Sequence, residues 1–210
     1  MIRILITDDH AIVRQGLARI LEKNQQMKIV AECDNGSEAL NWLRQNDCDI
    51  ALIDISMPGM NGIDLLKQLR EEKPKLPVLI ISIYPEDQYA VRLIKAGAAG
   101  YLTKGSAPAI VLEAVALVAS GKKYISPAVA EMLANEFNAD YGKLPHETLS
   151  DREYQIFLLL ASAKTVSEIA DSLALSAKTI STYRSRILEK MHLRNNAELM
   201  HYAVDNHLMV

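Results

Sequence analysis

Five polar residues stand where short apolar runs of the sequence end: Asp8, Asp9, Asp54, Ser82 and Lys104. Carboxylates that converge on one point repel each other unless a cation lies among them, and a set of oxygen ligands selects the hard cation Mg²⁺. A carboxylate beside Mg²⁺ can attack a phosphoryl group while a nearby hydroxyl and ammonium interact with the transferring oxygens. These residue types therefore predict Mg²⁺-dependent transfer of a phosphoryl group to a carboxylate, if the fold brings them together.

The apolar runs themselves predict such a fold. Each is short, rich in β-branched residues and bounded by turn residues, which indicates buried strands at 2–6, 29–33, 50–53, 78–81 and 100–102. Amphipathic segments predict helices at 11–23, 37–46, 63–72, 86–96 and 107–120. This alternation predicts right-handed crossovers and a doubly wound, flavodoxin-like α/β domain with a five-stranded parallel sheet. Active sites of such sheets form where the strands end, so the five polar residues are expected to meet there.

The rest of the chain has a different pattern. Residues 121–148 contain one expected short helix near Ser126 and Pro127, followed by a polar stretch, which indicates a linker. Residues 149–210 carry only helical patterns and predict an all-α domain with helices at 150–163, 166–174, 177–191 and 196–208. Two helix starts carry capping boxes, because Ser150 and Thr165 each stand three residues before a glutamate.

The composition limits the class of protein. A length of 210 residues suits two small domains, and 23% charged residues with a net charge of −3 are typical of a globular protein. No apolar stretch reaches the ~18 residues that span a bilayer, so we expect no signal peptide, no membrane insertion and a cytoplasmic protein. Cys33 and Cys48 lack metal-binding spacing and are interpreted as reduced, packed thiols.

The strand-end residues belong to longer motifs that resemble the receiver domain of two-component response regulators: Asp8-Asp9-His10, Asp54-Ile55-Ser56-Met57-Pro58-Gly59-Met60-Asn61-Gly62, Ser82 and Gly97-Ala98-Ala99-Gly100-Tyr101-Leu102-Thr103-Lys104. The resemblance covers residues 1–120. It implies that Asp54 accepts a phosphoryl group from a sensor histidine kinase. It also implies that the chain is no enzyme in its own right and only assists its own phosphorylation and dephosphorylation.

The same resemblance implies how the site works. Asp9 and Asp54 would bind Mg²⁺ directly, Asp8 through water, and the backbone carbonyl of Ser56 would complete the metal site. Lys104 would hold the phosphoryl group, while Ser82 and Tyr101 would form the pair that moves when phosphate arrives. His10 is interpreted as a helix-start residue, since carboxylates suffice for Mg²⁺.

A basic helix marks the second domain. Residues 149–210 hold seven Lys/Arg and seven Asp/Glu, but 176–194 carry five basic residues against Glu189 alone. Ile180, Ile187, Leu188 and Met191 occupy the opposite face of this segment. A short turn joins it to the preceding helix, which is the geometry that inserts a second helix into the DNA major groove.

The motifs of this domain resemble the LuxR-type helix-turn-helix of the NarL/FixJ family, most closely its GacA/UvrY-like subgroup: Leu149-Ser150-Asp151-Arg152-Glu153, Glu168-Ile169-Ala170, Leu175-Ser176-Ala177-Lys178-Thr179-Ile180 and Arg184 to Lys190. The resemblance to that subgroup is carried by the segments Thr179 to Arg186, Gly100 to Gly105 and Tyr124-Ile125-Ser126-Pro127. Ser181 and Tyr183 depart from the Lys and His of many family members. Base contacts are expected from Lys178, Thr179, Ser181, Thr182 and Arg186, and phosphate contacts from Tyr183 and Arg184.

The resemblance implies a phosphorylation-dependent transcription regulator. Its implied partners are a hybrid, membrane-bound sensor kinase, promoter DNA that includes small regulatory RNA genes, and a second copy of the chain on an inverted repeat. The expected seam between the copies is the last helix, with Leu199, Met200, Ala203, Val204 and Leu208. Two alternatives remain. A haloacid dehalogenase-type phosphohydrolase would need a second Asp where Ser56 stands, and a helical output domain could instead bind protein.

Overall fold

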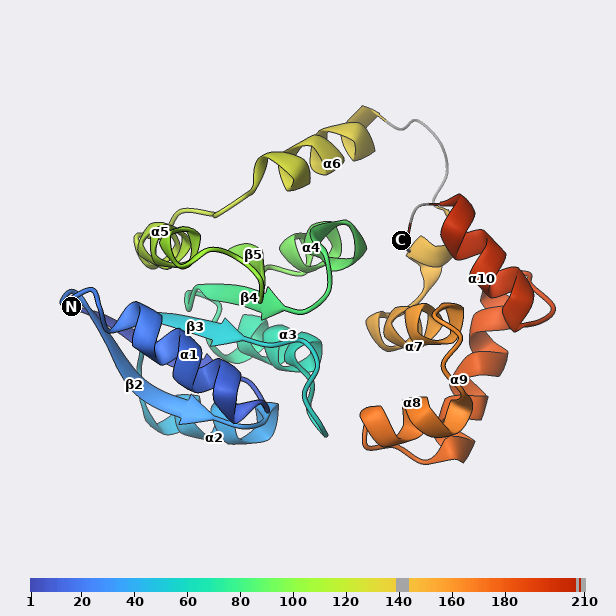
Figure 1. The fold of residues 1–210 in the computed structure, drawn as a ribbon, viewed down its shortest axis with the longest axis horizontal. Coiled ribbons are helices and arrows are strands. Elements are labelled where there is room, and N and C mark those ends of the chain that lie inside the picture. The colour runs from blue at the N-terminus through green and yellow to red at the C-terminus, as the bar shows by residue number, and fades with distance from the viewer. Residues whose placement is uncertain (139–143, 207, 209–210) are drawn as a thin grey trace. The chain divides into compact units, whose positions relative to one another are not determined.

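The computed structural model describes residues 1–138, 144–206 and 208 of the chain. The chain divides into two compact units, Met1–Glu136 and Phe137–Val210. The first unit combines a sheet with helices and the second is helical, which confirms the predicted fold class (Figure 1). None of the described helices combines the length and the apolar character needed to cross a bilayer.

A five-stranded parallel sheet forms the centre of the first unit. Its strands lie in the order β2-β1-β3-β4-β5, which is the predicted flavodoxin-like order. Their bounds are β1 (Ile2–Thr7), β2 (Met27–Cys33), β3 (Ile50–Ile53), β4 (Val78–Ser82) and β5 (Gly100–Thr103). Every predicted strand is present, and all except β3 are longer than predicted by one or two residues.

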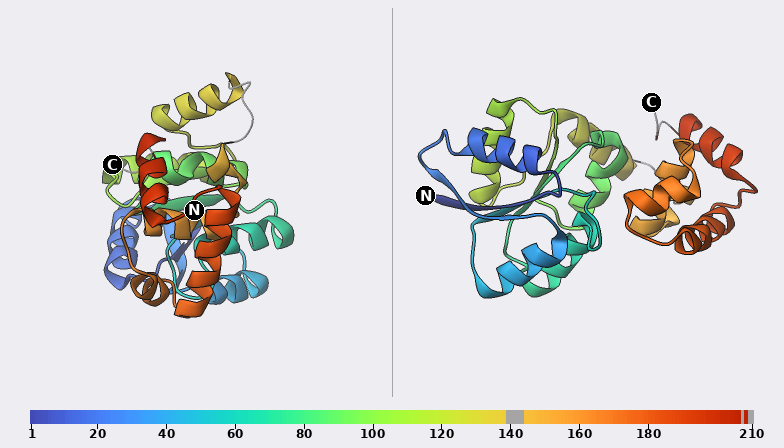
Figure 2. Two further views of the ribbon diagram at one scale, coloured as in Figure 1. Left: turned by 90° about the vertical axis from the view of Figure 1, so that its right-hand side faces the viewer. Right: turned by 60° about the horizontal axis from the view of Figure 1, so that its bottom comes forward.

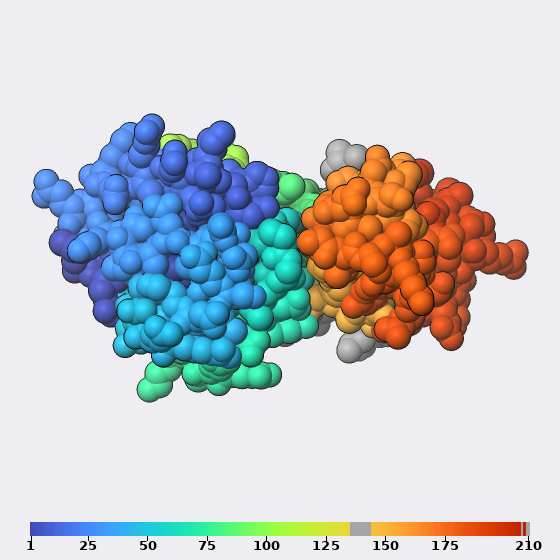
Figure 3. Space-filling view, turned by 90° about the horizontal axis from the view of Figure 1, so that it is seen from below, coloured from blue at the N-terminus to red at the C-terminus, as the bar shows by residue number. Residues whose placement is uncertain are grey.

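Helices cover both faces of this sheet: α1 (Ala11–Leu21), α2 (Gly36–Gln45), α3 (Gly62–Glu72), α4 (Glu86–Lys95) and α5 (Pro108–Ala119). Helices α1 and α5 contact each other on one face, and α2 and α3 contact each other on the other (Figures 1 and 2). Figure 3 shows the surface that α1 and α2 give to one side of the unit. Ile4 and Ile6 of β1 pack with Leu21 of α1 and Val115 of α5 in one buried core. Burial of each such side chain stabilises the unit by about 1.5–3 kcal/mol.

Asparagine caps determine where two of these helices begin. The Asn35 side chain accepts a hydrogen bond from the backbone N–H of Glu38, and the Asn61 side chain accepts from the N–H groups of Ile63 and Asp64. Such caps satisfy N–H groups that have no partner inside the helix. The helices predicted from 37 and 63 therefore begin one residue earlier.

The segment after α5 remains attached to the sheet. Tyr124 forms a parallel bridge with Gly100, and its backbone N–H donates to the carbonyl of Ala99 at 2.8 Å. Helix α6 (Pro127–Asn138) follows and is longer than the short helix expected here. The first unit extends to Glu136, beyond the receiver limit predicted at 120. Residues 139–143 of the predicted linker lie outside the described residues.

The second unit contains the 3₁₀ helix η1 (Pro145–Thr148) and the helices α7 (Asp151–Ala161), α8 (Val166–Ser172), α9 (Ala177–Lys190) and α10 (Asn196–Asp205). Helix η1 lies in the predicted linker and was not expected. Helix α7 packs against α9 and α10, and α8 packs against α9. The core of this unit includes Ile156, Phe157, Ile169, Ile180, Ile187 and Leu199. The last helix ends at Asp205, three residues before its predicted end.

Both predicted capping boxes are present, and one of them is tied to another helix. Glu153 is buried and accepts a hydrogen bond from the Ser150 backbone N–H at 2.8 Å. Its carboxylate also accepts from Lys190 Nζ of α9 at 2.6 Å. Burial alone would raise the pKa of Glu153, but the hydrogen bonds from Lys190 and Ser150 outweigh burial and hold that pKa below its usual value.

Replacing this carboxylate tests its contribution to stability. We expect Glu153→Ala to lower the free energy of unfolding of the helical unit by about 1–3 kcal/mol at neutral pH, because Lys190 and the Ser150 N–H lose their acceptor. Since the folded-state pKa lies below the unfolded one, this stabilisation is fully present above the unfolded pKa. It is lost as the pH falls through the folded one. Denaturant unfolding across a pH series measures both effects.

The other capping box supplies the control. Glu168 is exposed and pairs with Thr165 in the same way: its carboxylate accepts from the Thr165 backbone N–H and hydroxyl, and its own backbone N–H donates to the Thr165 hydroxyl. Glu168→Ala should therefore cost less than Glu153→Ala. Equal losses for the two variants would show that the contact with Lys190 adds nothing.

Candidate functional site

The acidic residues that follow β1 and β3 lie side by side. Thr7 and Ile53 are paired in the sheet, and the backbone N–H of Asp54 donates to the carbonyl of Thr7 at 2.8 Å. The N–H of Asp8 donates to the carbonyl of Cys33 at the end of β2, at 3.1 Å. Asp8 and Asp54 are 1% and 2% exposed, so two carboxylates are buried together at this edge of the sheet. Their convergence was predicted from the strand ends.

Lys104 supplies positive charge to both carboxylates. Its Nζ lies 2.7 Å from Oδ2 of Asp8 and 2.9 Å from Oδ2 of Asp54. The Lys104 backbone N–H donates to the carbonyl of Ser82 at 2.7 Å, which fixes the loop after β5 against the end of β4. The structure thus brings the predicted lysine to the predicted acids.

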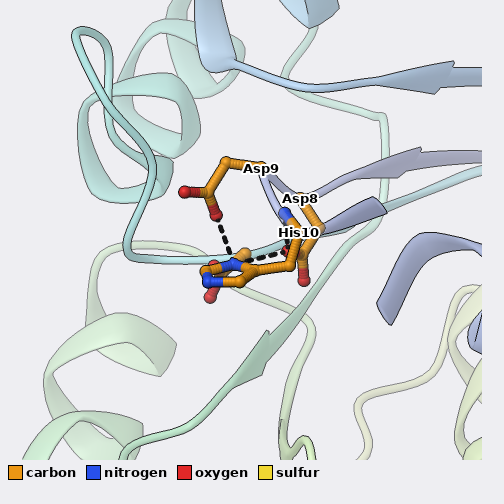
Figure 4. Close-up of side chains that lie close together, drawn as sticks. Asp8, Asp9 and His10 are labelled. Carbon is orange, nitrogen blue, oxygen red and sulfur yellow. Dashed lines mark hydrogen bonds and ion pairs between the residues drawn. The ribbon is translucent and has the colours of Figure 1, made fainter. Parts of the chain in front are cut away.

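Asp9 and His10 complete a cluster around the same point (Figure 4). Nδ1 of His10 lies 2.7 Å from Oδ1 of Asp9 and 3.4 Å from Oδ1 of Asp8, and the His10 backbone N–H donates to Asp8 Oδ1 at 2.8 Å. His10 precedes α1, as a helix-start residue should, yet its ring also faces the carboxylates. The ring was not predicted to face this site, since carboxylates suffice for Mg²⁺. The backbone turn that directs it toward Asp9 leaves no sequence pattern.

The cluster fits a cation. Asp8, Asp9, His10 and Asp54 each offer one possible ligand atom, and these atoms all lie within 4.8 Å of one another. Among the described residues, the buried Oδ1 of Asp54 and the buried side-chain oxygen of Ser56 have no hydrogen-bond partner. Buried oxygens without partners are costly unless a ligand satisfies them. A mainly carboxylate set with spare oxygens matches the ligand preference of Mg²⁺.

The pKa shifts follow from burial and from the shared charge. Burial raises the pKa of Asp54, with the Lys104 ammonium opposing this rise and the Asp8 carboxylate adding to it. Burial alone would lower the pKa of Lys104, but its hydrogen bonds and ion pairs with Asp8 and Asp54 outweigh burial and raise it. Lys104 therefore remains a cation at the site.

Two residues outside the predicted set hold the acids in place. Arg14 of α1 donates from its guanidinium to the backbone carbonyl of Asp8. Gly62 donates from its N–H to the carbonyl of Ile55 at 3.0 Å, and a Cβ at this position would lie 2.0 Å from the carbonyl oxygen of Asp54. Only glycine allows α3 to begin so close to Asp54. The receiver motif includes Gly62, but its close approach to the Asp54 backbone depends on the fold and could not be predicted from the motif.

The predicted switch residues lie next to this site. Ser82 is fully buried at the end of β4, and its Oγ accepts a hydrogen bond from the Tyr84 backbone N–H at 3.2 Å. Tyr101 is 2% exposed, and its hydroxyl donates to the Tyr84 carbonyl at 2.8 Å. Burial raises the pKa of Tyr101, while the neighbouring Ser82 hydroxyl opposes this rise. Both predicted side chains thus contact the loop between β4 and α4.

Helix α9 has the two faces that its sequence predicts. Ile180, Ile187 and Met191 are buried in the helical unit. The opposite face carries a shallow hollow of about 290 Å³, lined by Ser176, Lys178, Thr179, Thr182, Tyr183 and Arg186. Ser181 is exposed outside the hollow. Arg184 is half-buried, and its Nε donates to the Asn196 side chain of α10 at 2.6 Å.

Two family models match this chain. Residues 4–116 match the response regulator receiver domain, and residues 147–203 match the bacterial regulatory proteins of the luxR family. The first match covers the whole acidic cluster with Lys104, and the second covers α9 with its hollow. The chain belongs to the LuxR-type response regulators.

Individual relatives span nearly the whole response regulator. The chain is 40% identical to the response regulator GacA of Pseudomonas viridiflava, over 97% of this chain and 96% of that one. It is 36% identical to the response regulator UvrY of Escherichia coli, over 97% and 94%. The structure of RcsB from Salmonella enterica serovar Typhimurium, bound to promoter P1flhDC in the presence of the phosphomimetic BeF₃⁻, matches with a TM-score of 0.65. It is 26% identical and covers 96% of this chain and 97% of that one. The predicted family and subgroup resemblance are confirmed.

Three of the five residues predicted to join two copies of the chain do not lie on the surface. Leu199 and Ala203 are fully buried inside the helical unit and Leu208 is 8% exposed, so these three belong to its core. Met200 and Val204 are 39% and 55% exposed and remain on the surface of α10. Helical spacing gave one apolar stripe, but it could not show that most of the stripe faces α7.

A pair of glycine substitutions tests how closely α3 approaches the phosphoacceptor candidate. Gly62→Ala should lower the free energy of unfolding of the receiver unit by roughly 1–3 kcal/mol, because the new Cβ overlaps the Asp54 carbonyl. Gly16, in the interior of α1, has no atom within 4 Å of an added Cβ. Gly16→Ala should therefore stabilise the unit by about 0.5–1 kcal/mol. Denaturant unfolding measures both changes in the free energy of unfolding. If the two variants changed it in the same direction, the packing that we describe would be wrong.

Proposed function

We propose that Asp54 accepts a phosphoryl group from a sensor histidine kinase and that the phosphorylated chain binds promoter DNA through α9. The observation that carries the first half is the pair of buried carboxylates held by one lysine, with the Asp54 Oδ1 atom free of hydrogen bonds among the described residues. That oxygen is the nucleophile: it forms the new bond to phosphorus while the bond to the donor group breaks.

Mg²⁺ is the proposed cofactor. Asp9 and Asp54 would bind it directly, Asp8 would bind through water, and the Ser56 carbonyl would complete the set. When bound, the ion supplies positive charge to the transferring phosphoryl oxygens. Lys104 already lies at Asp54, so its ammonium can move from the carboxylate to the phosphoryl group formed there. Ser82 and Tyr101 would then follow the phosphoryl oxygen and pass the change to the face around α4 and β5.

The second half rests on α9. Its exposed Lys178 and Arg186 border a hollow of hydroxyl side chains, which suits base edges and phosphates. We propose base contacts for Lys178, Thr179, Ser181, Thr182 and Arg186, and phosphate contacts for Tyr183 and Arg184. Asn196 would hold the Arg184 guanidinium in place for its phosphate. The RcsB relative bound to a promoter supports DNA as the ligand.

We also propose the further features that the subgroup resemblance implies. The kinase is a hybrid, membrane-bound sensor, the targets include small regulatory RNA genes, and the regulator works in the cytoplasm. Two copies bind an inverted repeat with half-sites about one helical turn apart. Met200 and Val204 are the remaining candidates for their contact. The chain catalyses nothing beyond its own phosphorylation and dephosphorylation.

Labelling with acetyl phosphate and Mg²⁺ tests the phosphoacceptor. Asp54→Asn should keep the fold and lose the label, because an amide cannot form an acyl phosphate. Mass spectrometry of peptides locates the label. Asp64→Asn, at an exposed acid in the first turn of α3, should retain full labelling. Comparable label on the Asp54→Asn chain would disprove the assignment.

A salt series separates DNA from a protein ligand of the helical unit. Arg184→Ala should weaken binding to operator duplex and flatten the dependence of log affinity on log salt by about one unit, because one phosphate-neutralising cation is lost. Lys164→Ala, at an exposed lysine outside α9, should leave the slope unchanged. If the wild-type chain bound neither operator nor random-sequence duplex at low salt, a protein-binding output would be favoured instead.

A further inference from the structure

The segment Tyr124-Ile125-Ser126-Pro127 has no role in the site described so far. Ser126 Oγ donates a hydrogen bond to Oε2 of Glu86 at 2.6 Å. Glu86 lies in the first turn of α4, forty residues earlier in the chain. This contact therefore joins the start of α6 to the start of α4 within the receiver unit.

Ser126 uses the same hydroxyl to begin α6. The Val129 backbone N–H donates to Ser126 Oγ at 3.3 Å, and the Ala130 N–H donates to the Ser126 carbonyl at 2.9 Å. Val129, in the first turn of α6, is 2% exposed. Before it, Tyr124 is bonded to the edge of β5. Glu86 thus holds the helix at its capping residue, where a helix is most easily loosened.

The acceptor of this hydrogen bond is close in sequence to the switch. Ser82 Oγ and the Tyr101 hydroxyl both bond to the backbone of Tyr84, two residues before Glu86. The Glu86 carboxylate also lies near enough to Tyr101 to raise the pKa of its hydroxyl. Movement of Ser82 or Tyr101 toward a phosphoryl group breaks a hydrogen bond to the backbone of Tyr84, two residues before the acceptor Glu86.

We propose that the Ser126–Glu86 hydrogen bond is a latch that holds α6 on the receiver unit while Asp54 is unphosphorylated, and that phosphorylation weakens it. The switching half of this proposal rests on the proposed function. The holding half rests only on the contacts of Ser126. Since α6 stands between the receiver and the DNA-binding domain in sequence, its release changes the connection between them.

Hydrogen exchange of the full chain tests the holding half. A hydrogen bond to a charged carboxylate is strong enough that its loss should raise the exchange of interior α6 amides about tenfold. Glu86→Ala removes the acceptor and leaves the Ser126 cap intact. Asp87→Ala is the matched control, because it removes the neighbouring exposed first-turn acid of the same helix. Ser126→Thr keeps the hydroxyl and should behave like the wild type.

The result that supports the latch is faster α6 exchange in Glu86→Ala than in the wild-type chain, with wild-type exchange in Asp87→Ala and in Ser126→Thr. Equal exchange in the Glu86→Ala and Asp87→Ala chains would overturn it. Both comparisons are made without a phosphodonor, so they stand whether or not Asp54 accepts phosphate.

Acetyl phosphate with Mg²⁺ then tests the switching half. It should speed α6 exchange in the wild-type chain and change it little in Glu86→Ala, where the latch is already absent. If Asp54 carries the label and α6 exchange is unchanged, switching by the latch is wrong while the phosphoacceptor stands. If Asp54 carries no label, the proposed function fails and the switching half fails with it.

Discussion

Two buried carboxylates cannot remain charged side by side unless positive charge lies next to them, and the receiver unit is arranged around this constraint. Asp8 and Asp54 come from adjacent strands, and the ammonium of Lys104 reaches both from the loop after β5. Lys104 contacts Oδ2 of Asp54, while Oδ1 has no hydrogen-bond partner within the described part of the chain and so remains available. The order of the strands, the glycine that opens α3 and the arginine that holds the Asp8 carbonyl all serve this one arrangement.

Much of this could be predicted because parallel strands end at one edge. Once the strand ends at Asp8, Asp54, Ser82 and Lys104 were assigned, topology alone brought them together. Contacts made by loop backbones were not predictable in the same way. The ring of His10 faces Asp9 because of a turn that leaves no periodic pattern. An apolar stripe also does not reveal its partner, which is why Leu199 was assigned to a surface although it is fully buried.

In the helical unit, local features could be predicted from the sequence and long-range contacts could not. Capping boxes and helical periodicity are local, so the starts of α7 and α8 and the two faces of α9 agree with prediction. The bond from Lys190 to Glu153 joins residues far apart in sequence, and it removes one basic residue of α9 from the set available to DNA. Arg184 lies outside the hollow, and its Nε donates to Asn196, which positions its guanidinium. Lys178 and Arg186 therefore supply most of the exposed positive charge around the hollow.

We propose that Lys104 and a divalent cation each supply the positive charge that Asp8 and Asp54 need. The most direct test is the free energy of unfolding of the Lys104→Met chain, which keeps the side-chain length without the charge, over a Mg²⁺ titration. Without metal it should be lower than that of the wild type by about 1–3 kcal/mol, since the carboxylates lose their counter-ion. Saturating Mg²⁺ should recover much of this loss, because binding to the folded state alone stabilises it. Equal stability of the two chains without metal, or no response of the variant to Mg²⁺, would contradict the account.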